Sequence, residues 1–471
     1  MAATTHAPPL PAPRLATKGL ALLILLSAAQ FMVTVDVTVT NLATPAIGRT
    51  LGLAASDLSW VVTAYTLMTG ALLLLGGRLA DIVGARRTFL AGLGVFTTAS
   101  LVAGLAQSEA MLIGARAAQG AGAALLSPGA LAVLVSSFTG AQRTRALAVW
   151  GAVASAGAAI GVLLGGALVT WASWRWAFLI NVPVGVAAAV LVPRLISARE
   201  ARRGGSLDLP GALTVTTALF ALVYAIERAP DDGWGSAQTI GLFALFAALL
   251  AVFTAIERRA AHPLVPAGLF RSKTTSAGTL TMFVATALLV GMFFLGSIYM
   301  QQTLGLDAIE AGLGFLPVAL IIGFASHAGS HLLPKVGSRV TATAGLLLAG
   351  AGNLLLTGVD AGGSYFTDVM PGLLVGSAGI GLAFVTASVT SMHGVPHERA
   401  GLASGVMTTA HEIGAALGVA VLSAIALSGV GALDFGLAFS VAGTAGLAAA
   451  AVALVAFPAI KPSAGARAMM H

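Results

Sequence analysis

The chain has 471 residues, of which 58% are hydrophobic and only 9% are charged. A soluble domain carries about a quarter of charged residues, so this composition excludes a water-facing fold and predicts that the lipid bilayer is the solvent. The chain contains no cysteine, which excludes disulfides and cysteine metal sites. The net charge of +7 would suit a nucleic-acid binder, but the positions of the basic residues argue against that.

Residues 1–18 are rich in proline and alanine and lack the ordered basic, apolar and small-residue regions of a cleavable signal peptide. We expect them to form a cytoplasmic tail, followed by a first apolar stretch that is retained as a span. Windows of about twenty mostly apolar residues then predict an all-α integral membrane fold with fourteen transmembrane helices.

The spans fall into three groups. Six lie in residues 19–197, two in residues 198–274 and six in residues 275–458, and a second cytoplasmic tail covers residues 459–471. The predicted spans are Gly19–Leu42, Leu58–Leu75, Thr88–Ala106, Met111–Phe138, Ala146–Val169, Trp176–Ile196, Pro210–Ile226, Thr239–Ile256, Ala277–Tyr299, Gly312–Leu333, Val340–Val359, Val369–Met392, Ala403–Leu427 and Phe435–Phe457.

The basic residues orient these spans. With a cytoplasmic N-terminus, every Lys and Arg falls in a cytoplasmic segment except Arg49, Arg116, Arg175 and Arg228. Positive charge gathers on the cytoplasmic side of membrane proteins, so both termini are predicted to be cytoplasmic. Attraction to anionic lipids then explains the basic balance, and no nucleic-acid partner is expected.

A charged string, Gly77-Arg78-Leu79-Ala80-Asp81-Ile82-Val83-Gly84-Ala85-Arg86-Arg87, lies between the second and third predicted spans. A degraded copy without an acid, residues 329–339, follows the second span of the last group and also ends in Gly-x-Arg. The first and last groups therefore read as two related six-helix halves, and the middle pair as an insertion between them.

Four strings resemble motifs of one transporter family. They are the Gly77–Arg87 string, Asp36-Val37-Thr38-Val39-Thr40-Asn41-Leu42-Ala43, Arg116-Ala117-Ala118-Gln119-Gly120, and the stripe of Gly157, Gly161, Gly165 and Gly166. The chain resembles the major facilitator superfamily, and within it the fourteen-span drug:proton antiporter branch (QacA-type multidrug efflux transporters). The resemblance implies alternating access between two six-helix halves, driven by the proton gradient.

The intramembrane polar residues of the first and fourth spans are the first candidates for proton coupling or substrate binding. An ionised Asp36 inside a span costs about 2.5–3.5 kcal/mol to insert, which favours a functional role; the alternative is a surface aspartate, if the span ends near Val35. The resemblance gives Arg116 a part in proton transfer beside Gln119 and Asn41, whereas a snorkelling Arg116 near the membrane surface is the alternative.

The thirteenth span departs from the family pattern with a His411-Glu412 pair. Apolar or small residues flank Glu412 on both sides, so it is expected deep in the bilayer as a second proton site or as the partner of a substrate cation. A neutral Glu412 hydrogen-bonded between helices is the alternative. His411 is a further candidate, although it lies about 100° away around the helix.

The glycine stripe of the fifth span allows another helix to approach closely. In the family this is the antiporter motif, in which proline usually follows the middle glycine. Val162 stands there in this chain, so close packing without a kink is an equal reading, and uptake by a proton-coupled symporter stays an alternative to export.

The resemblance assigns Gly77, Asp81, Gly84, Arg86 and Arg87 to a cytoplasmic gate that closes the outward-facing state. A simple topogenic basic loop is the alternative. Ile82 and Ala85 replace residues that are often basic, which predicts fewer ionic contacts than usual.

The remaining polar residues are predicted to be structural. Trp174 to Gly185, which includes Asn181, reads as an interfacial loop, and Glu227 and Glu257 read as interface charges. His327 and His331 are four residues apart, but no third ligand accompanies them, so no metal site is expected.

The sequence therefore predicts a monomeric, proton-coupled exporter of lipophilic organic compounds, with cations favoured, in a bacterial inner membrane. No cofactor is expected, because the chain lacks a phosphate-binding Gly-x-x-x-x-Gly-Lys-Ser/Thr loop. No cluster of nucleophile, base and metal ligands indicates an enzyme. A non-transporting membrane sensor or enzyme is the alternative from another class.

Overall fold

A computed structural model describes residues 17–195, 207–260, 263–265, 268–360, 362–396, 399–428 and 433–458. Within these residues, fourteen helical segments are long and apolar enough to cross a membrane, which confirms the predicted count and the all-α fold. The predicted tails lie almost wholly outside the described residues, as do the basic residues Arg14, Arg199, Arg202, Arg203, Lys461 and Arg467.

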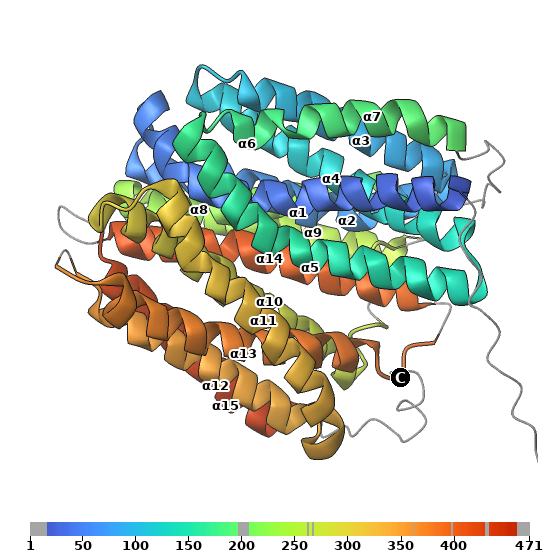
Figure 1. The fold of residues 1–471 in the computed structure, drawn as a ribbon. Coiled ribbons are helices and arrows are strands. Elements are labelled where there is room, and N and C mark those ends of the chain that lie inside the picture. Colours follow the sequence, from blue (N-terminus) through green and yellow to red (C-terminus); the bar gives the residue numbers. More distant parts are fainter. Residues whose placement is uncertain are drawn as a thin grey trace, which may run out of the picture.

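The N-terminal half contains the first six spans (Figure 1). Its helices are α1 (Thr17–Leu51), α2 (Trp60–Val83), α3 (Ala85–Gly104), α4 (Glu109–Ser137), α5 (Gly140–Trp171), the short α6 (Trp176–Leu179) and α7 (Asn181–Leu195), with a turn η1 (Ala55–Asp57) before α2. Helices are the expected form, because only they satisfy every backbone polar group of a single span in lipid.

The C-terminal half repeats this plan after an inserted hairpin of α8 (Leu209–Asp232) and α9 (Ala237–Arg259). Its helices are α10 (Lys273–Ile298), α11 (Ala308–Val336), α12 (Ser338–Leu355), α13 (Met370–Met392), α14 (Ala400–Leu427) and α15 (Phe435–Ala456), with the short turns η2 (Tyr299–Thr303), η3 (Leu356–Gly358) and η4 (Tyr365–Val369).

The two halves pack in the same way. In each half the first span contacts the fifth, the second and third contact the fourth, and the third contacts the sixth. Between the halves, α2 contacts α14 and α5 contacts α11, so the second span of each half meets the fifth span of the other. This shared pairing is the structural form of the internal repeat predicted from the sequence.

The two charged strings form equivalent turns. Gly84 (φ 107°) joins α2 to α3, and Gly337 (φ 87°) joins α11 to α12; both have positive φ, which glycine adopts without strain. Two residues later, Arg86 Nη2 donates to Pro193 O at 3.1 Å at the end of the sixth span of its half. Arg339 Nε donates to Phe457 O at 2.7 Å at the corresponding place in the other half.

The halves are closed together at the end of the bundle opposite these turns, here called the Ile309 end. Ile309 N donates to Thr170 Oγ1 at 3.1 Å, which joins α11 to α5. A Cβ on Gly166 would lie 2.7 Å from Ala308 O, and one on Gly312 would lie 2.7 Å from Val162 O. Contacts this close leave no passage between α5 and α11 there.

At the opposite end, here called the Gly84 end, α5 and α11 lie apart. Figure 1 shows the two helices meeting at the Ile309 end and diverging toward the Gly84 end. A Cβ on Gly323, midway along α11, would meet nothing within 4 Å. On the other side, α2 and α14 remain in contact as far as Leu74 and Gly405. The structure is therefore a state that is closed at the Ile309 end.

Candidate functional site

Asp36 lies in the middle of α1 and is fully buried. Because α1 continues to Leu51, the alternative of a surface aspartate after a span that ends near Val35 is wrong. A fully buried carboxylate is costly unless hydrogen-bond donors surround it, so its contacts decide what it can do.

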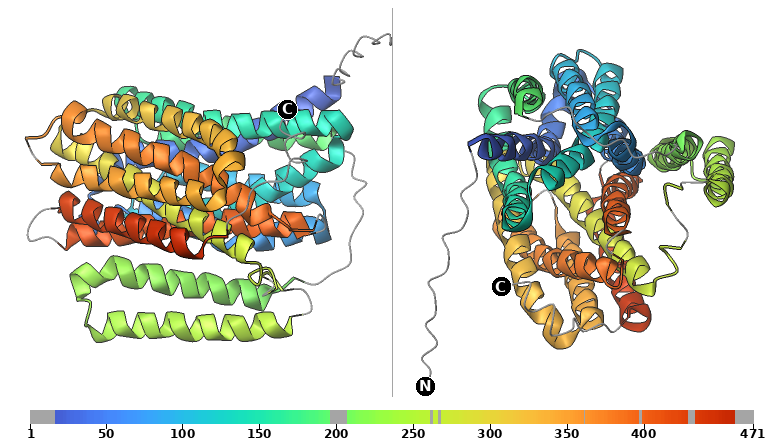
Figure 2. Two further views of the ribbon diagram at one scale, coloured as in Figure 1. Left: turned by 90° about the horizontal axis from the view of Figure 1, so that it is seen from below. Right: turned by 90° about the vertical axis from the view of Figure 1, so that its right-hand side faces the viewer.

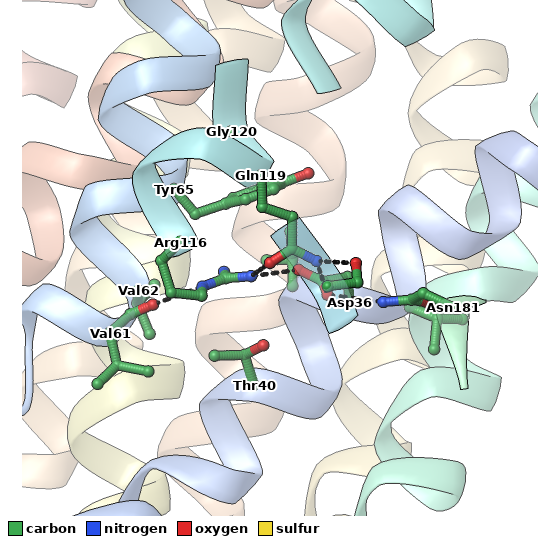
Figure 3. Close-up of polar contacts among 12 residues, drawn as sticks. Asp36, Thr40, Val61, Val62, Tyr65, Arg116, Gln119, Gly120 and Asn181 are labelled. Atoms are coloured by element: carbon green, nitrogen blue, oxygen red, sulfur yellow. Dashed lines mark hydrogen bonds and ion pairs between the residues drawn. The ribbon is translucent and has the colours of Figure 1, made fainter. Parts of the chain in front are cut away.

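Three side chains donate to the Asp36 carboxylate (Figure 3). Arg116 Nη1 lies 2.5 Å from Oδ2, and Gln119 Nε2 lies 2.6 Å from Oδ1. Asn181 Nδ2 donates to the same Oδ1 at 3.0 Å. Both carboxylate oxygens are thus satisfied, in the way that buried charges require.

Arg116 is also fully buried, so the snorkelling alternative is wrong. Its Nε donates to Val61 O at 2.8 Å, and Nη1 also contacts Gln119 Oε1 at 2.7 Å. Its guanidinium lies 4.4 Å from the centre of the Tyr65 ring, a cation–π distance. The planar guanidinium therefore links α1, α2 and α4 through fixed hydrogen bonds.

Two members of this cluster were not predicted as site residues. Asn181 was expected to serve only the loop into the sixth span, and Ser100 Oγ accepts from Gln119 Nε2 at 2.9 Å from α3. A serine and an asparagine in apolar helices are weak signals by themselves. The cluster of Asp36, Arg116, Gln119, Asn181 and Ser100 is called the Asp36 cluster below.

Asn41 does not join the Asp36 cluster. Its side chain donates to Val37 O at 2.8 Å on its own helix. Pro45, four residues later, has no N–H to give to Asn41 O, and Ser297 Oγ of α10 donates to that carbonyl instead at 3.1 Å. The backbone hydrogen bond that the proline removes from α1 is thus replaced by a side chain of the other half, at the closed end of the bundle.

The glycine stripe of α5 serves two contacts. Cβ atoms on Gly157, Gly161 and Gly165 would meet α1, and the one on Gly161 would clash with Thr38 Oγ1. Gly166 faces α11 of the other half. The stripe therefore packs helices closely, as one of the two readings predicted, and the side chain of Val162 is buried beside it.

Glu412 lies on α14 and is only partly buried. It faces the N-terminal half, because a Cβ on Gly70 of α2 would lie 2.9 Å from Glu412 Cβ. Its carboxylate makes no hydrogen bond or ion pair with any residue that the structure describes. The alternative of a Glu412 hydrogen-bonded between helices is therefore not seen among the described residues.

His411 faces the other way, as its position around the helix predicts. Its Nδ1 lies 2.9 Å from Thr286 Oγ1 of α10, and its ring centre lies 5.8 Å from that of Phe384 of α13. His411 thus belongs to the packing of the C-terminal half, while Glu412 points across the interface between the halves.

Tyr65 of α2 packs on the guanidinium of Arg116. It is buried, and among the described residues its hydroxyl oxygen has no hydrogen-bond partner. Figure 3 shows its ring beside Arg116 and Gln119. Tyr65 therefore covers the buried ion pair from the α2 side.

The predicted gate residues lie apart from both acids, at the Gly84 end. Asp81 and Arg87 are exposed, and Asp81 makes no hydrogen bond or ion pair within the described part of the chain. Gly77 faces open space, while Gly84 forms the turn and Arg86 holds the end of α7. Among the described residues, Asp81 therefore forms no ionic latch across the halves in this state.

The two histidines of α11 do not form a metal site with other ligands. His327 and His331 are exposed, with ring centres 4.8 Å apart. Across the described ranges, no group of three His, Cys, Asp or Glu side chains is placed to hold a metal ion.

Comparisons with known proteins agree with this architecture. Residues 26–419 match the family model described as the Major Facilitator Superfamily. A cephamycin export protein of Amycolatopsis lactamdurans is 41% identical over 414 residues, covering 86% of this chain and 85% of that protein. A puromycin resistance protein of Streptomyces alboniger is 38% identical over 407 residues, covering 86% of this chain and 81% of that protein.

The fold also matches solved transporters. The crystal structure of an auto-inhibited peptide transporter of the POT family superposes with a TM-score of 0.69, covering 93% of this chain and 96% of that one. The two sequences are only 14% identical, so this likeness concerns the fold alone.

Proposed function

Because the chain is a member of the Major Facilitator Superfamily, we propose that it exports antibiotic-like organic compounds across a bacterial inner membrane in exchange for protons. Relatives that are 41% and 38% identical over most of their length are named for cephamycin export and puromycin resistance, which supports efflux over uptake. Alternating access about a midplane site is the transport mode of such paired halves.

The observation that carries the coupling proposal is the unpartnered carboxylate of Glu412. Asp36 already has Arg116 as its counter-ion, whereas Glu412 has none among the described residues. A proton or a substrate cation can each neutralise Glu412, and a single carboxylate does not hold both at once. Mutually exclusive occupancy of one acid is a physical basis for antiport and favours cationic substrates.

The Asp36 cluster has a different part in this proposal. It fixes α1, α2, α4 and α7 around one ion pair. The cluster thus sets the shape and the charge of the N-terminal wall opposite the exchanging acid. No cofactor is part of this scheme, and one copy of the chain suffices for it.

The orientation in the membrane is part of the proposal. Basic residues gather at the Gly84 end, including Arg87 beside the α2–α3 turn and Arg258 and Arg259 at the end of α9. This bias supports a cytoplasmic Gly84 end. The structure then corresponds to a state closed toward the outside, which receives its substrate from the cytoplasm.

Growth of a pump-deficient bacterial host tests the direction of transport. Expression of the chain should raise the puromycin or cephamycin concentration that the host survives, and ethidium extends the panel to a simple lipophilic cation. A host that becomes more sensitive would indicate uptake. Unchanged survival with every compound, at normal levels of the protein in the membrane, would contradict export of these compounds.

Labelling of single cysteines tests the orientation, because the native chain has no cysteine to interfere. In intact cells, a membrane-impermeant thiol reagent should modify an Asp232→Cys variant and spare an Arg87→Cys variant, both at exposed positions at opposite ends. The reverse pattern would overturn the proposed orientation.

A further inference from the structure

The inserted hairpin breaks the symmetry between the halves. Within the described residues, α8 contacts both α2 and α14 and so covers the seam between them, while the α5–α11 seam has no such cover. Figure 2 shows the hairpin along one side of the bundle, with α9 outermost. Only 6% of the most apolar stretch of α9 is buried, so lipid contacts most of it.

The polar contacts of α8 go to the N-terminal half. Glu227, predicted as an interface charge, is instead buried at 1% exposure and accepts a hydrogen bond from Ser59 Oγ at the start of α2. One helix position later, Arg228 Nη2 lies 3.7 Å from Asp57 Oδ1 of η1. Both contacts lie at the Ile309 end of α8.

Aromatic contacts join the same two elements. The ring of Trp60, the first residue of α2, stacks on Phe220 of α8 at 6.1 Å between centres and lies 6.2 Å from the ring of Tyr224. Stacked aromatic pairs add a directional preference to apolar burial. The side of α8 that carries Phe220, Tyr224 and Glu227 is therefore fastened to α2.

The contact of α8 with α14 has a different character. Ala416, Ala420 and Ala424 of α14 lie one helical turn apart and pack in one apolar cluster with Val223 and Ile226 of α8. Across the described residues, no hydrogen bond or ion pair joins these two helices. A ridge of methyl groups offers contact without directional bonds, so little holds α14 in one register along α8.

At the Gly84 end, the hairpin is hydrogen-bonded to the linker that follows α9 and leads to α10. Glu257 near the end of α9 accepts from Leu264 N at 3.1 Å and from Val265 N at 2.8 Å. Leu269, further along, packs against Ala403 and Val406 of α14. The covalent connection to the C-terminal half therefore runs through this linker, while the body of the hairpin meets that half only through the apolar contact with α14.

We propose that the α8–α9 hairpin moves as a part of the N-terminal half, held by Glu227, while α14 slides along its apolar side when the halves rock. Glu227 is then a positioning residue that keeps the hairpin over the seam and lipid out of it. This inference needs neither proton coupling nor a particular substrate.

Distances between spin labels test which half carries the hairpin. Cysteines placed at exposed positions of the Ile309 end in the cysteine-free chain mark the N-terminal half (Gln107→Cys), the hairpin (Ala237→Cys) and the C-terminal half (Thr367→Cys). Pairs are measured by double electron–electron resonance, with and without Gly312→Trp. That substitution should force the Ile309 end open, because a Cβ there meets Val162 O at 2.7 Å.

The proposal expects the distance from hairpin to N-terminal half to stay constant. The other two distances should lengthen together. A hairpin that keeps its distance to the C-terminal half, or that moves against both halves, overturns the proposal. Gly166→Trp is a second variant that should force the Ile309 end open. If the distance between the halves changes in neither tryptophan variant, the proposal is overturned as well.

Substitutions at Glu227 test the anchor itself. Glu227→Leu removes the acceptor for Ser59 at similar volume, so the distribution of distances between the hairpin and the N-terminal half should broaden. Glu227→Gln keeps an acceptor, so this distribution should stay narrow. Glu257→Gln at the other end of the hairpin is the matched control and should leave it narrow too. A native width in Glu227→Leu would show that Glu227 is not the anchor.

Discussion

Two acids inside the membrane region of this protein have opposite surroundings. Asp36 is fully buried and receives hydrogen bonds from Arg116, Gln119 and Asn181, whereas Glu412 is partly buried and has no such partner among the described residues. Full burial with full pairing makes an acid part of the framework, and partial burial without pairing leaves an acid available to a ligand. The contrast predicts different consequences of substitution at the two places.

The largest loss of stability is expected where a buried charge loses its counter-ion. Arg116→Ala leaves Asp36 buried without its ion-pair partner and should lower the free energy of unfolding by about 3–5 kcal/mol, with loss of transport. Unfolding of purified protein in detergent measures this. Arg116→Lys keeps the charge but loses the contacts of a guanidinium, so its free energy of unfolding should lie between those of the native protein and Arg116→Ala. Native stability in Arg116→Ala would mean that Asp36 is not held as an ionised framework group.

A smaller loss is expected from removal of one neutral donor of the cluster. Asn181→Ala leaves Asp36 Oδ1 with Gln119 alone and should destabilise the protein by about 1–3 kcal/mol in the same assay. Asn181→Asp, of nearly equal size, places a second acid beside Asp36 and should cost more. If both variants unfold like the native protein, Asn181 is not a functional part of the Asp36 cluster.

The seam beside Glu412 is expected to respond less than the buried cluster. Gly70→Ala places a methyl group 2.9 Å from Glu412 Cβ and 3.2 Å from Ile413 N, and neither atom moves without its backbone. The variant should cost the about 1–3 kcal/mol of overpacking, reduced by the about 1 kcal/mol by which alanine favours a helix over glycine. Gly77→Ala, seven residues further along α2, meets nothing within 4 Å and is the matched control. Equal stability of the two variants would show that α2 and α14 are not in close contact at Gly70.

The smallest change in stability is expected at Glu412 itself. Glu412→Gln removes a charge that no described residue pairs with, so the free energy of unfolding should stay within about 0.5 kcal/mol of the native value. Transport of a cationic compound should nevertheless be lost in reconstituted vesicles, while transport of a neutral compound is affected less. A large loss of stability would favour the alternative of a neutral Glu412 that is hydrogen-bonded between helices.

Much of the fold follows from local patterns in the sequence. Apolar length, basic residues at alternating span ends and the copy of the Gly77–Arg87 string predict fourteen spans and two related halves, because lipid imposes one solution on each span. Span ends were less predictable. The first helix runs nine residues beyond the predicted Leu42, and at that point Ser297 and Gln301 of the other half donate to the carbonyls of Asn41 and Leu42. Such contacts with a distant segment are not encoded in the local apolar pattern.

The candidate site was predictable only in part, because its contacts join helices that are distant in sequence. Asp36, Arg116 and Gln119 were predicted as candidates and do meet, but Asn181 was assigned to loop structure and Glu227 to the membrane surface. A single asparagine or glutamate in an apolar stretch does not reveal which helix it faces. Contacts such as Glu227 with Ser59, which join an inserted span to the first half, depend on packing that no local pattern encodes.

In the proposed exchange, Glu412, and not the Asp36 cluster, takes up a proton when it releases the substrate. The most direct test is the response of a proton gradient imposed on inverted membrane vesicles to added puromycin or ethidium. Native protein should dissipate the gradient, and Glu412→Gln, present at native levels, should give no response. Glu412→Asp, which keeps the charge, should restore part of it. A Glu412→Gln variant that dissipates the gradient like the native protein would contradict the account.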